Sequence, residues 1–324
     1  MARSKKDKSI LIIFFEAVRI FCMNIHKFFL YMAFPVIGQI IGIFIVFGLA
    51  LWFKTNFNVI IEKYHFFNNP SSLTIFIIIL TLPGILILLK AFYDYLIAYG
   101  ALNSMAEGAV ETGRVYDFPA HNAVIKKRIF SFTGLWLLFG IFSILAIFPL
   151  FWVLGGILFI YFILIFQVFT FNEGLTAVEC FKKSFFLIKG YFARTAFLVI
   201  ILAITIYLFT MGMTILFQAV KINNFLLNIC YTFTASLPLD NINSLYNSSD
   251  IIITPDMIAD TCLDNIIFLF TFEFLLPLRS IVWTLWYKNL NSLKYIDNKP
   301  QKKRKTAVKK LDKNILKRAK NEDI

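Results

Sequence analysis

The chain has 324 residues, of which 59% are hydrophobic and 16% are charged, and phenylalanine alone occurs 39 times. A water-soluble domain of this length cannot bury so large an apolar fraction, which excludes the soluble globular classes. The formal net charge is +13, and much of it lies between Lys299 and Lys320, where eleven basic residues accompany a single acid. We therefore expect an integral membrane protein with a basic C-terminal tail.

Six apolar runs are long enough to cross a hydrocarbon core about 30 Å thick, which takes roughly 20 helical residues. They are Phe28 to Phe53, Leu73 to Tyr93, Phe130 to Phe148, Trp152 to Phe169, Phe192 to Phe217 and Ile266 to Trp286. Each run is apolar on every face, whereas membrane β-strands alternate in polarity. The predicted fold is all-α, an integral membrane bundle of six transmembrane helices with amphipathic helices on its cytoplasmic side.

The expected organisation has three parts: an N-terminal interfacial helix over residues 1–27, a membrane domain over 28–290 and a basic cytoplasmic tail over 291–324. A second amphipathic segment, "GLTAVECFKKSFFLIKG" at 174–190, has Thr176 and Glu179 at the spacing of a capping box and Gly190 at its natural stop. A third lies in the tail, after the helix-breaking Pro300. These segments are predicted to lie at the membrane surface.

Basic residues are distributed unevenly between the loops. The N-terminal stretch and the second and fourth loops are rich in Lys and Arg, whereas the first, third and fifth loops carry only Lys54, Lys63 and Lys221. Cytoplasmic loops of membrane proteins carry the excess of basic residues. Both termini are therefore predicted to face the cytoplasm.

Two charges, Glu273 and Arg279, interrupt the last apolar run. If this span begins at Ile266, both lie within about 5 Å of the bilayer midplane, where a charge costs at least ~2.5 kcal/mol. Each must then face the bundle interior and find a partner, or Glu273 must be neutral. An ideal helix turns by about 240° net between the two positions, so it does not align them.

This polar site has two interpretations. In the first, Glu273 and Arg279 bond to polar groups on other spans, such as Gln39 or Gln167, and fix the helix register. In the second, the four residues form an intramembrane polar site that meets a head group, an ion or a proton. The sequence leaves both open.

Two further pairs are candidates. Lys90 and Asp94 form an i, i+4 pair near the cytoplasmic end of the second span, where snorkelling of their side chains explains them. Cys230 and Cys262 both belong to the exterior side of the membrane, and they form a possible disulfide in an oxidising compartment.

The tail is expected to attract anionic lipid head groups at the cytoplasmic face. Its basic set is Lys302, Lys303, Arg304, Lys305, Lys309, Lys310, Lys313, Lys317 and Arg318. The same charge suits phosphate contacts with ribosomal RNA, but the tail has no aromatic residue on which bases would stack. Membrane lipids are the expected partners. No nucleic acid other than ribosomal RNA is expected to bind.

Motifs of catalysis are missing from the sequence. It contains no phosphate-binding GxxxxGK[ST] loop, no GxGxxG, no GxSxG and no HExxH. Its three histidines, His26, His65 and His121, fall in separate loops, which does not favour a shared metal site. We expect a protein that is not an enzyme and that holds no metal or cofactor.

Two segments, "EGLTAVECFKKSFFLIKGYFAR" at 173–194 and "PLRSIVWTLWYKNL" at 277–290, resemble hallmarks of a bacterial polytopic membrane family. This family comprises the membrane domain of glycerophosphoryl diester phosphodiesterases and its stand-alone relatives of unknown function. The matching residues are Lys183, Ser184, Lys189, Gly190, Tyr287 and Leu290, whereas Lys288 and Asn289 replace the acid of the second motif. The resemblance implies a bacterial inner-membrane protein, and it implies no phosphodiesterase activity because the catalytic barrel of those fusions is absent.

The function expected from these observations is non-enzymatic and lipid-associated, either in envelope organisation or in the handling of a lipid or hydrophobic cargo. An alternative is a secondary transporter or permease for a small solute, because Pro35, Pro83 and Pro277 provide possible helix breaks. A third is an insertase-like protein that docks ribosomes through the tail.

Overall fold

The computed structural model describes residues 7–64, 69–115, 118–145, 148–149, 152–220, 222–235 and 253–319, without the side chains of 47, 50, 51, 54, 55, 58, 61, 70, 145, 222, 233 and 295–319. Helices joined by turns make up this part of the chain, which contains no strand. In chain order they are α1 (Ile10–Thr55), α2 (Phe57–Lys63), α3 (Pro70–Thr112), α4 (Phe118–Lys126), α5 (Ile129–Leu145), α6 (Trp152–Phe162), α7 (Ile165–Phe171), α8 (Ala177–Ile188), α9 (Phe192–Ala219), α10 (Ile222–Thr234) and α12 (Pro255–Ala319).

Within the described residues, five helical segments are long and apolar enough to cross a membrane: Ile10–Val46, Ser71–Thr112, Trp152–Phe171, Phe192–Ala219 and Pro255–Lys294. A sixth is reached if α4 and α5 count as one span, although they are bent by 74° at the break between them. The predicted third span corresponds to α5, which reaches the required length only together with α4. The all-α membrane bundle predicted from the sequence is thus confirmed.

Two predicted boundaries do not occur. Residues 10–27, expected as a separate interfacial helix, form the first part of the continuous helix α1. Ile13, Ala17 and Phe21 lie four residues apart on one face and are buried in the core, so packing extends the helix past the interface. Helix α12 likewise continues through Pro300, where a break was expected inside the tail, before its amphipathic segment.

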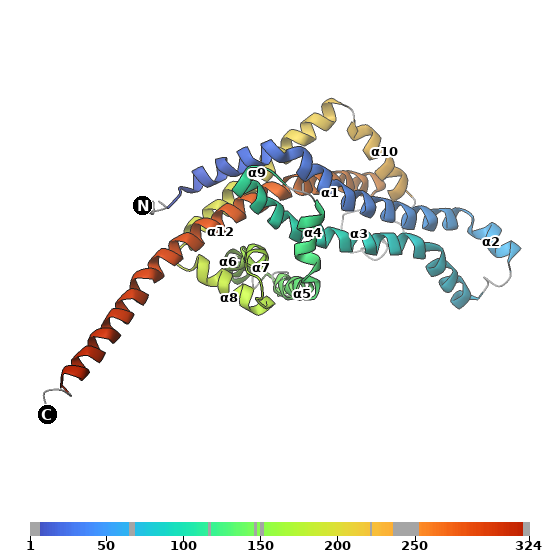
Figure 1. The fold of residues 1–324 in the computed structure, drawn as a ribbon. Coiled ribbons are helices and arrows are strands. Elements are labelled where there is room, and N and C mark those ends of the chain that lie inside the picture. Colours follow the sequence, from blue (N-terminus) through green and yellow to red (C-terminus); the bar gives the residue numbers. More distant parts are fainter. Residues whose placement is uncertain are drawn as a thin grey trace.

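The hairpin of α1 and α3 packs closely through glycines. A Cβ atom added at Gly42 would lie 2.9 Å from the backbone of Leu88, and one added at Gly84 would lie 2.8 Å from a methyl of Val46. Small residues at such contacts allow membrane helices to approach one another, because packing replaces the hydrophobic effect inside lipid. The two long helices therefore pair side by side (Figure 1).

The remaining helices lie around this hairpin and α12. Figure 1 shows α4 to α8 gathered on one side of α3 and α12, and the start of α1 at the same end of the molecule as the outer part of α12. The largest fully buried side chains include Phe28, Phe132, Phe169 and Trp286, which come from α1, α5, α7 and α12. The core thus lies where the second half of α3 meets these helices.

Polar contacts join the start of the chain to α9 and α12. Arg194 at the start of α9 donates to the carboxylate of Asp7, and Asn289 on α12 donates to the same carboxylate at 3.2 Å. The hydrogen bond from Arg194 holds the pKa of Asp7 below its usual value. On α12, Lys288 forms an ion pair with Glu111 of α3 at 2.5 Å. These contacts place the N-terminal segment beside the end of the predicted last span.

Candidate functional site

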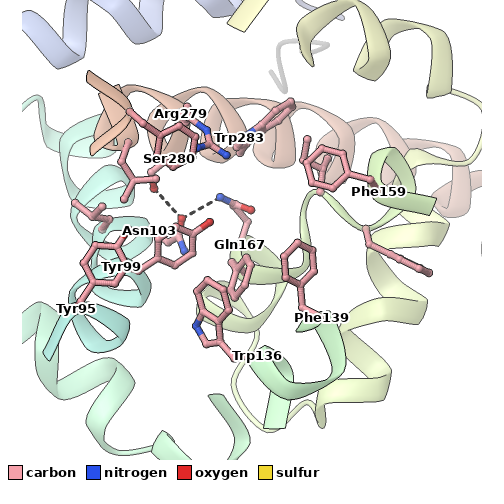
Figure 2. A pocket seen from close by; sticks show the side chains of 16 residues that line it. Tyr95, Tyr99, Asn103, Trp136, Phe139, Phe159, Gln167, Arg279, Ser280 and Trp283 are labelled. Atoms are coloured by element: carbon pink, nitrogen blue, oxygen red, sulfur yellow. Dashed lines mark hydrogen bonds between the residues drawn. The ribbon is translucent and has the colours of Figure 1, made fainter. Parts of the chain in front are cut away.

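A cavity of about 260 Å³ lies between α3, α5, α6, α7 and α12. Aromatic side chains dominate its wall, as Figure 2 shows. They are Tyr95, Tyr99, Trp136, Phe139, Phe159, Phe162, Phe166, Phe272 and Trp283. Such a wall offers large apolar contact area together with hydroxyl and indole donors.

Asn103 forms the polar centre of this cavity. Its Oδ1 accepts one hydrogen bond from Nε2 of Gln167 at 2.9 Å and another from the hydroxyl of Ser280 at 2.7 Å. The three side chains come from α3, α7 and α12, and all are buried. Figure 2 shows the two bonds converging on Asn103. This arrangement uses the NH₂ group of the Gln167 amide, so its Oε1 has no partner in the cluster.

Three buried polar atoms around the cavity have no hydrogen-bond partner in the described part of the chain. They are Oε1 of Gln167, Nη1 of Arg279 and Nε1 of Trp136. The guanidinium of Arg279 instead lies over the ring of Phe272, 4.5 Å from its centroid. Because more than nine in ten buried polar groups are normally paired with protein or ordered water, three unpaired atoms around one cavity indicate a place for water or for a ligand.

Glu273 lies beside this cavity but does not line it. The hydroxyl of Tyr95 donates to its Oε1 at 2.7 Å, and its Oε2 is buried without a partner among the described residues. Glu273 and Arg279 form no ion pair within the described residues. This agrees with the angle expected between the two positions on one helix.

The two glutamines predicted to share the polar site are separated. Gln167 lines the cavity next to Arg279, whereas Gln39 lies half-buried on α1 and is not part of the wall. Of the four predicted residues, Gln167 and Arg279 line the cavity, whereas Glu273 and Gln39 do not. The wall also contains Asn103, Ser280 and Trp136, which were not predicted from the sequence. Sequence reasoning missed Asn103 because it lies ten residues beyond the predicted end of the second span, at Tyr93.

The hydrogen bond between Tyr95 and Glu273 also changes the expected depth of the site. On α12, Glu273 lies near the middle of the predicted span, but Tyr95 lies just past the predicted end of the second span. Because the two side chains are in contact, they lie at the same depth along the bundle. The span predicted on α3 is therefore shifted along the bundle axis relative to the span predicted on α12. In the structure, the apolar helical segment of α3 runs from Ser71 to Thr112, so Tyr95 and Asn103 both lie within it.

The other predicted sets have separate locations. Lys90 and Asp94 form an ion pair on the exposed face of α3. Cys230 of α10 and Cys262 of α12 are free thiols that lie in contact, and burial together with the hydrogen bond between the two thiols raises the pKa of Cys230 to about 11. The disulfide between them stays a prediction. The side chains of the basic tail and His65 lie outside the described residues.

Residues of the two segments that carry the family resemblance meet at Asn172. Lys183 of α8 donates to the side-chain oxygen of Asn172, and the amide of Asn172 donates to the hydroxyl of Tyr287 at 2.9 Å. Burial lowers the pKa of Lys183, and Gly190 ends the segment with a φ of 92°. The segments are thus one packing unit that joins α7, α8 and α12.

Comparison with family models, with curated proteins and with solved structures finds no match to this chain. Within the described residues, no group of three or more His, Cys, Asp or Glu side chains is arranged to hold a metal ion. The candidate site is therefore defined by its own geometry: an aromatic cavity with one cation, one free indole donor and one free amide acceptor.

Proposed function

We propose that this chain is a non-enzymatic, lipid-associated protein of the bacterial inner membrane, with both termini in the cytoplasm, that binds an amphiphilic cargo in the aromatic cavity. The observation that carries the proposal is the set of three buried atoms on Gln167, Arg279 and Trp136 that have no partner among the described residues. The membrane location and topology rest on the distribution of basic residues and on the resemblance to the phosphodiesterase membrane domains.

The chemistry of the wall favours a molecule with one polar end. Arg279 and Trp136 offer donors to an anionic or carbonyl oxygen, and Gln167 offers an acceptor to a hydroxyl or amide group. The aromatic rings contact the apolar remainder of the cargo. A volume of about 260 Å³ holds a head group and the beginning of a chain rather than a whole lipid.

Native mass spectrometry of protein released from its own membranes tests the proposal. Arg279→Gln should remove a co-purifying amphiphile or reduce it by about tenfold, since a charge-assisted hydrogen bond contributes roughly 1.5–3 kcal/mol. Arg114→Gln is the matched control, because Arg114 is exposed on the turn after α3 and lies outside the cavity. Adducts that persist equally in both variants would contradict binding at Arg279.

Solute transport is the second candidate, and the unpartnered Oε2 of Glu273 favours it. A buried carboxylate with a free oxygen beside a cavity suits a cation or a proton. Absence of any lipid adduct in the wild type, together with a solute flux into vesicles that Glu273→Gln abolishes, would support this function over amphiphile binding. The insertase hypothesis rests on the tail, whose side chains lie outside the described residues.

A further inference from the structure

A second hollow lies on the outer surface of the α1 and α3 hairpin, and it shares no residue with the aromatic cavity. It consists of two adjoining hollows of about 320 Å³ and 380 Å³. Both are lined by Phe34, Pro35 and Asp94, so they form one continuous groove. We call it the α1/α3 groove.

One half of the groove is apolar. Gly38, Leu86, Ile87 and Ala91 line it, and Leu86 is 56% exposed. The groove continues along α3 to Ala98, a distance of about 18 Å at 1.5 Å per residue. The apolar half, from Leu86 to Ala91, accounts for about 8 Å of this distance, which leaves room for part of a fatty acyl chain.

The other half ends in polar groups from α4. The hydroxyl of Tyr31 donates to Oδ1 of Asn122, which leaves the amide NH₂ of Asn122 to donate elsewhere. Lys126 follows one turn later, lines the same hollow and is exposed. Lys126 takes part in no ion pair of the described residues. An ammonium and an amide donor one helical turn apart match the oxygens of a phosphodiester.

Asp94 lies between the two halves and does not repel such a group, because Lys90 pairs with it. The charged side chains of the groove are thus two cations and one anion, with the unpaired cation at the α4 end. Polar atoms at one end and an apolar trough at the other are the features of a glycerophospholipid site.

We propose that the α1/α3 groove holds one glycerophospholipid, with its phosphodiester on Asn122 and Lys126 and one acyl chain along Leu86 and Ala91. This site is separate from the aromatic cavity, and it does not depend on the function proposed for that cavity.

The test uses full-length protein in nanodiscs of phosphatidylcholine that contain a small fraction of phosphatidylglycerol with a photoactivatable diazirine on one acyl chain. Peptide mapping should find cross-links on residues 86–98 of α3. Lys126→Glu should lower their yield about fivefold or more, because one basic residue near a membrane surface attracts anionic lipid by about 1 kcal/mol and the reversal adds repulsion. Lys127→Glu is the matched control: Lys127 is the exposed neighbour and does not line the groove.

A second pair of variants tests the acyl half. Leu86→Trp should reduce the cross-links by filling the trough, whereas Leu89→Trp should not, since Leu89 is 59% exposed but lies outside the groove. Equal yields for Lys126→Glu and Lys127→Glu would overturn the proposal. Equal labelling by a diazirine diacylglycerol, which lacks the phosphate, would also overturn it by showing mere contact with surrounding lipid. Every groove variant should keep the amphiphile adduct that depends on Arg279. Failure of the groove proposal can therefore be distinguished from failure of the proposed function.

Discussion

At the scale of residues, Asn103 has a role that its neighbours do not share. One carbonyl oxygen on this side chain satisfies a donor from α7 and a donor from α12. Trp136 differs from Asn103, because its indole N–H is buried without a hydrogen-bond partner among the described residues. Asn103 therefore joins the helices, and Trp136 has a donor that the proposed cargo would use. Substitutions at these two positions should separate stability from binding.

Replacing Asn103 by Leu should destabilise the bundle by about 2 kcal/mol, because it leaves two buried donors unpaired. We expect no larger effect, because hydrogen bonds between membrane helices contribute little each when they are measured. Trp136→Phe should cost less, since no protein hydrogen bond is lost, and it should still reduce the bound amphiphile. Unfolding by sodium dodecyl sulfate titration measures the stability, and native mass spectrometry measures the adduct. A fully stable Asn103→Leu protein would contradict the shared acceptor.

At the scale of elements, α8 shows how a local sequence pattern fixes a helix end. The side chain of Thr176 accepts from the backbone N–H of Glu179, and the Glu179 carboxylate accepts in return from the backbone and hydroxyl of Thr176. Hydrogen bonds from Thr176 lower the pKa of Glu179. The capping box was predicted from spacing alone, because all its atoms belong to four consecutive residues.

The capping box should make the start of α8 sensitive to acid. A carboxylate whose pKa is lower in the folded state stabilises that state above its ordinary pKa, which is about 4.3 for glutamate, and loses this contribution as the pH falls through the lowered value. Hydrogen exchange of the first turn of α8, corrected for the intrinsic rate, should accelerate below pH ~4. Thr176→Ala should weaken the turn by about 1 kcal/mol at neutral pH.

Thr133→Ala provides the control for that measurement. The hydroxyl of Thr133 bonds only to the carbonyl of Ile129 in its own helix, so its loss removes no cap. Exchange at α8 should then match the wild type. An acid response that is identical in Thr176→Ala and in wild type would show that the box does not set the stability of this turn.

At the scale of the whole molecule, the spans could be predicted because the bilayer thickness sets the length of an apolar run. The ends of the helices could not be predicted, because they depend on packing against other helices. Apolar runs identified α1, α3, α9 and α12 because each must satisfy its backbone inside lipid. The continuation of α1 back to Ile10 follows from the buried stripe of Ile13 and Ala17, whose partners on other helices cannot be read from one chain segment. The cavity depends on the relative register of α3, α7 and α12, so Gln167 and Arg279 were found but Asn103 was not.

Whether the number of membrane crossings is even or odd decides on which side of the membrane α8 and the C-terminal end of α12 lie. If the bent pair of α4 and α5 crosses the membrane, the described helices make six passes, and α8 with Lys182 lies on the same side as both termini. If that pair is re-entrant, five passes place α8 and the end of α12 opposite the N-terminus. Basic residues concentrate in α8 and in the tail, and such residues are retained in the cytoplasm. We therefore expect six passes.

Single cysteines in an otherwise cysteine-free protein test this topology in intact cells. A membrane-impermeant maleimide should label Phe148→Cys, in the exposed turn between α5 and α6, from outside. It should label Lys182→Cys only after the inner membrane is opened, because α8 then faces the cytoplasm. External labelling at position 182 with protection at 148 would establish the re-entrant alternative. It would also place the basic tail outside the cell membrane, against the positive-inside rule and against the proposed attraction of that tail to cytoplasmic anionic lipid.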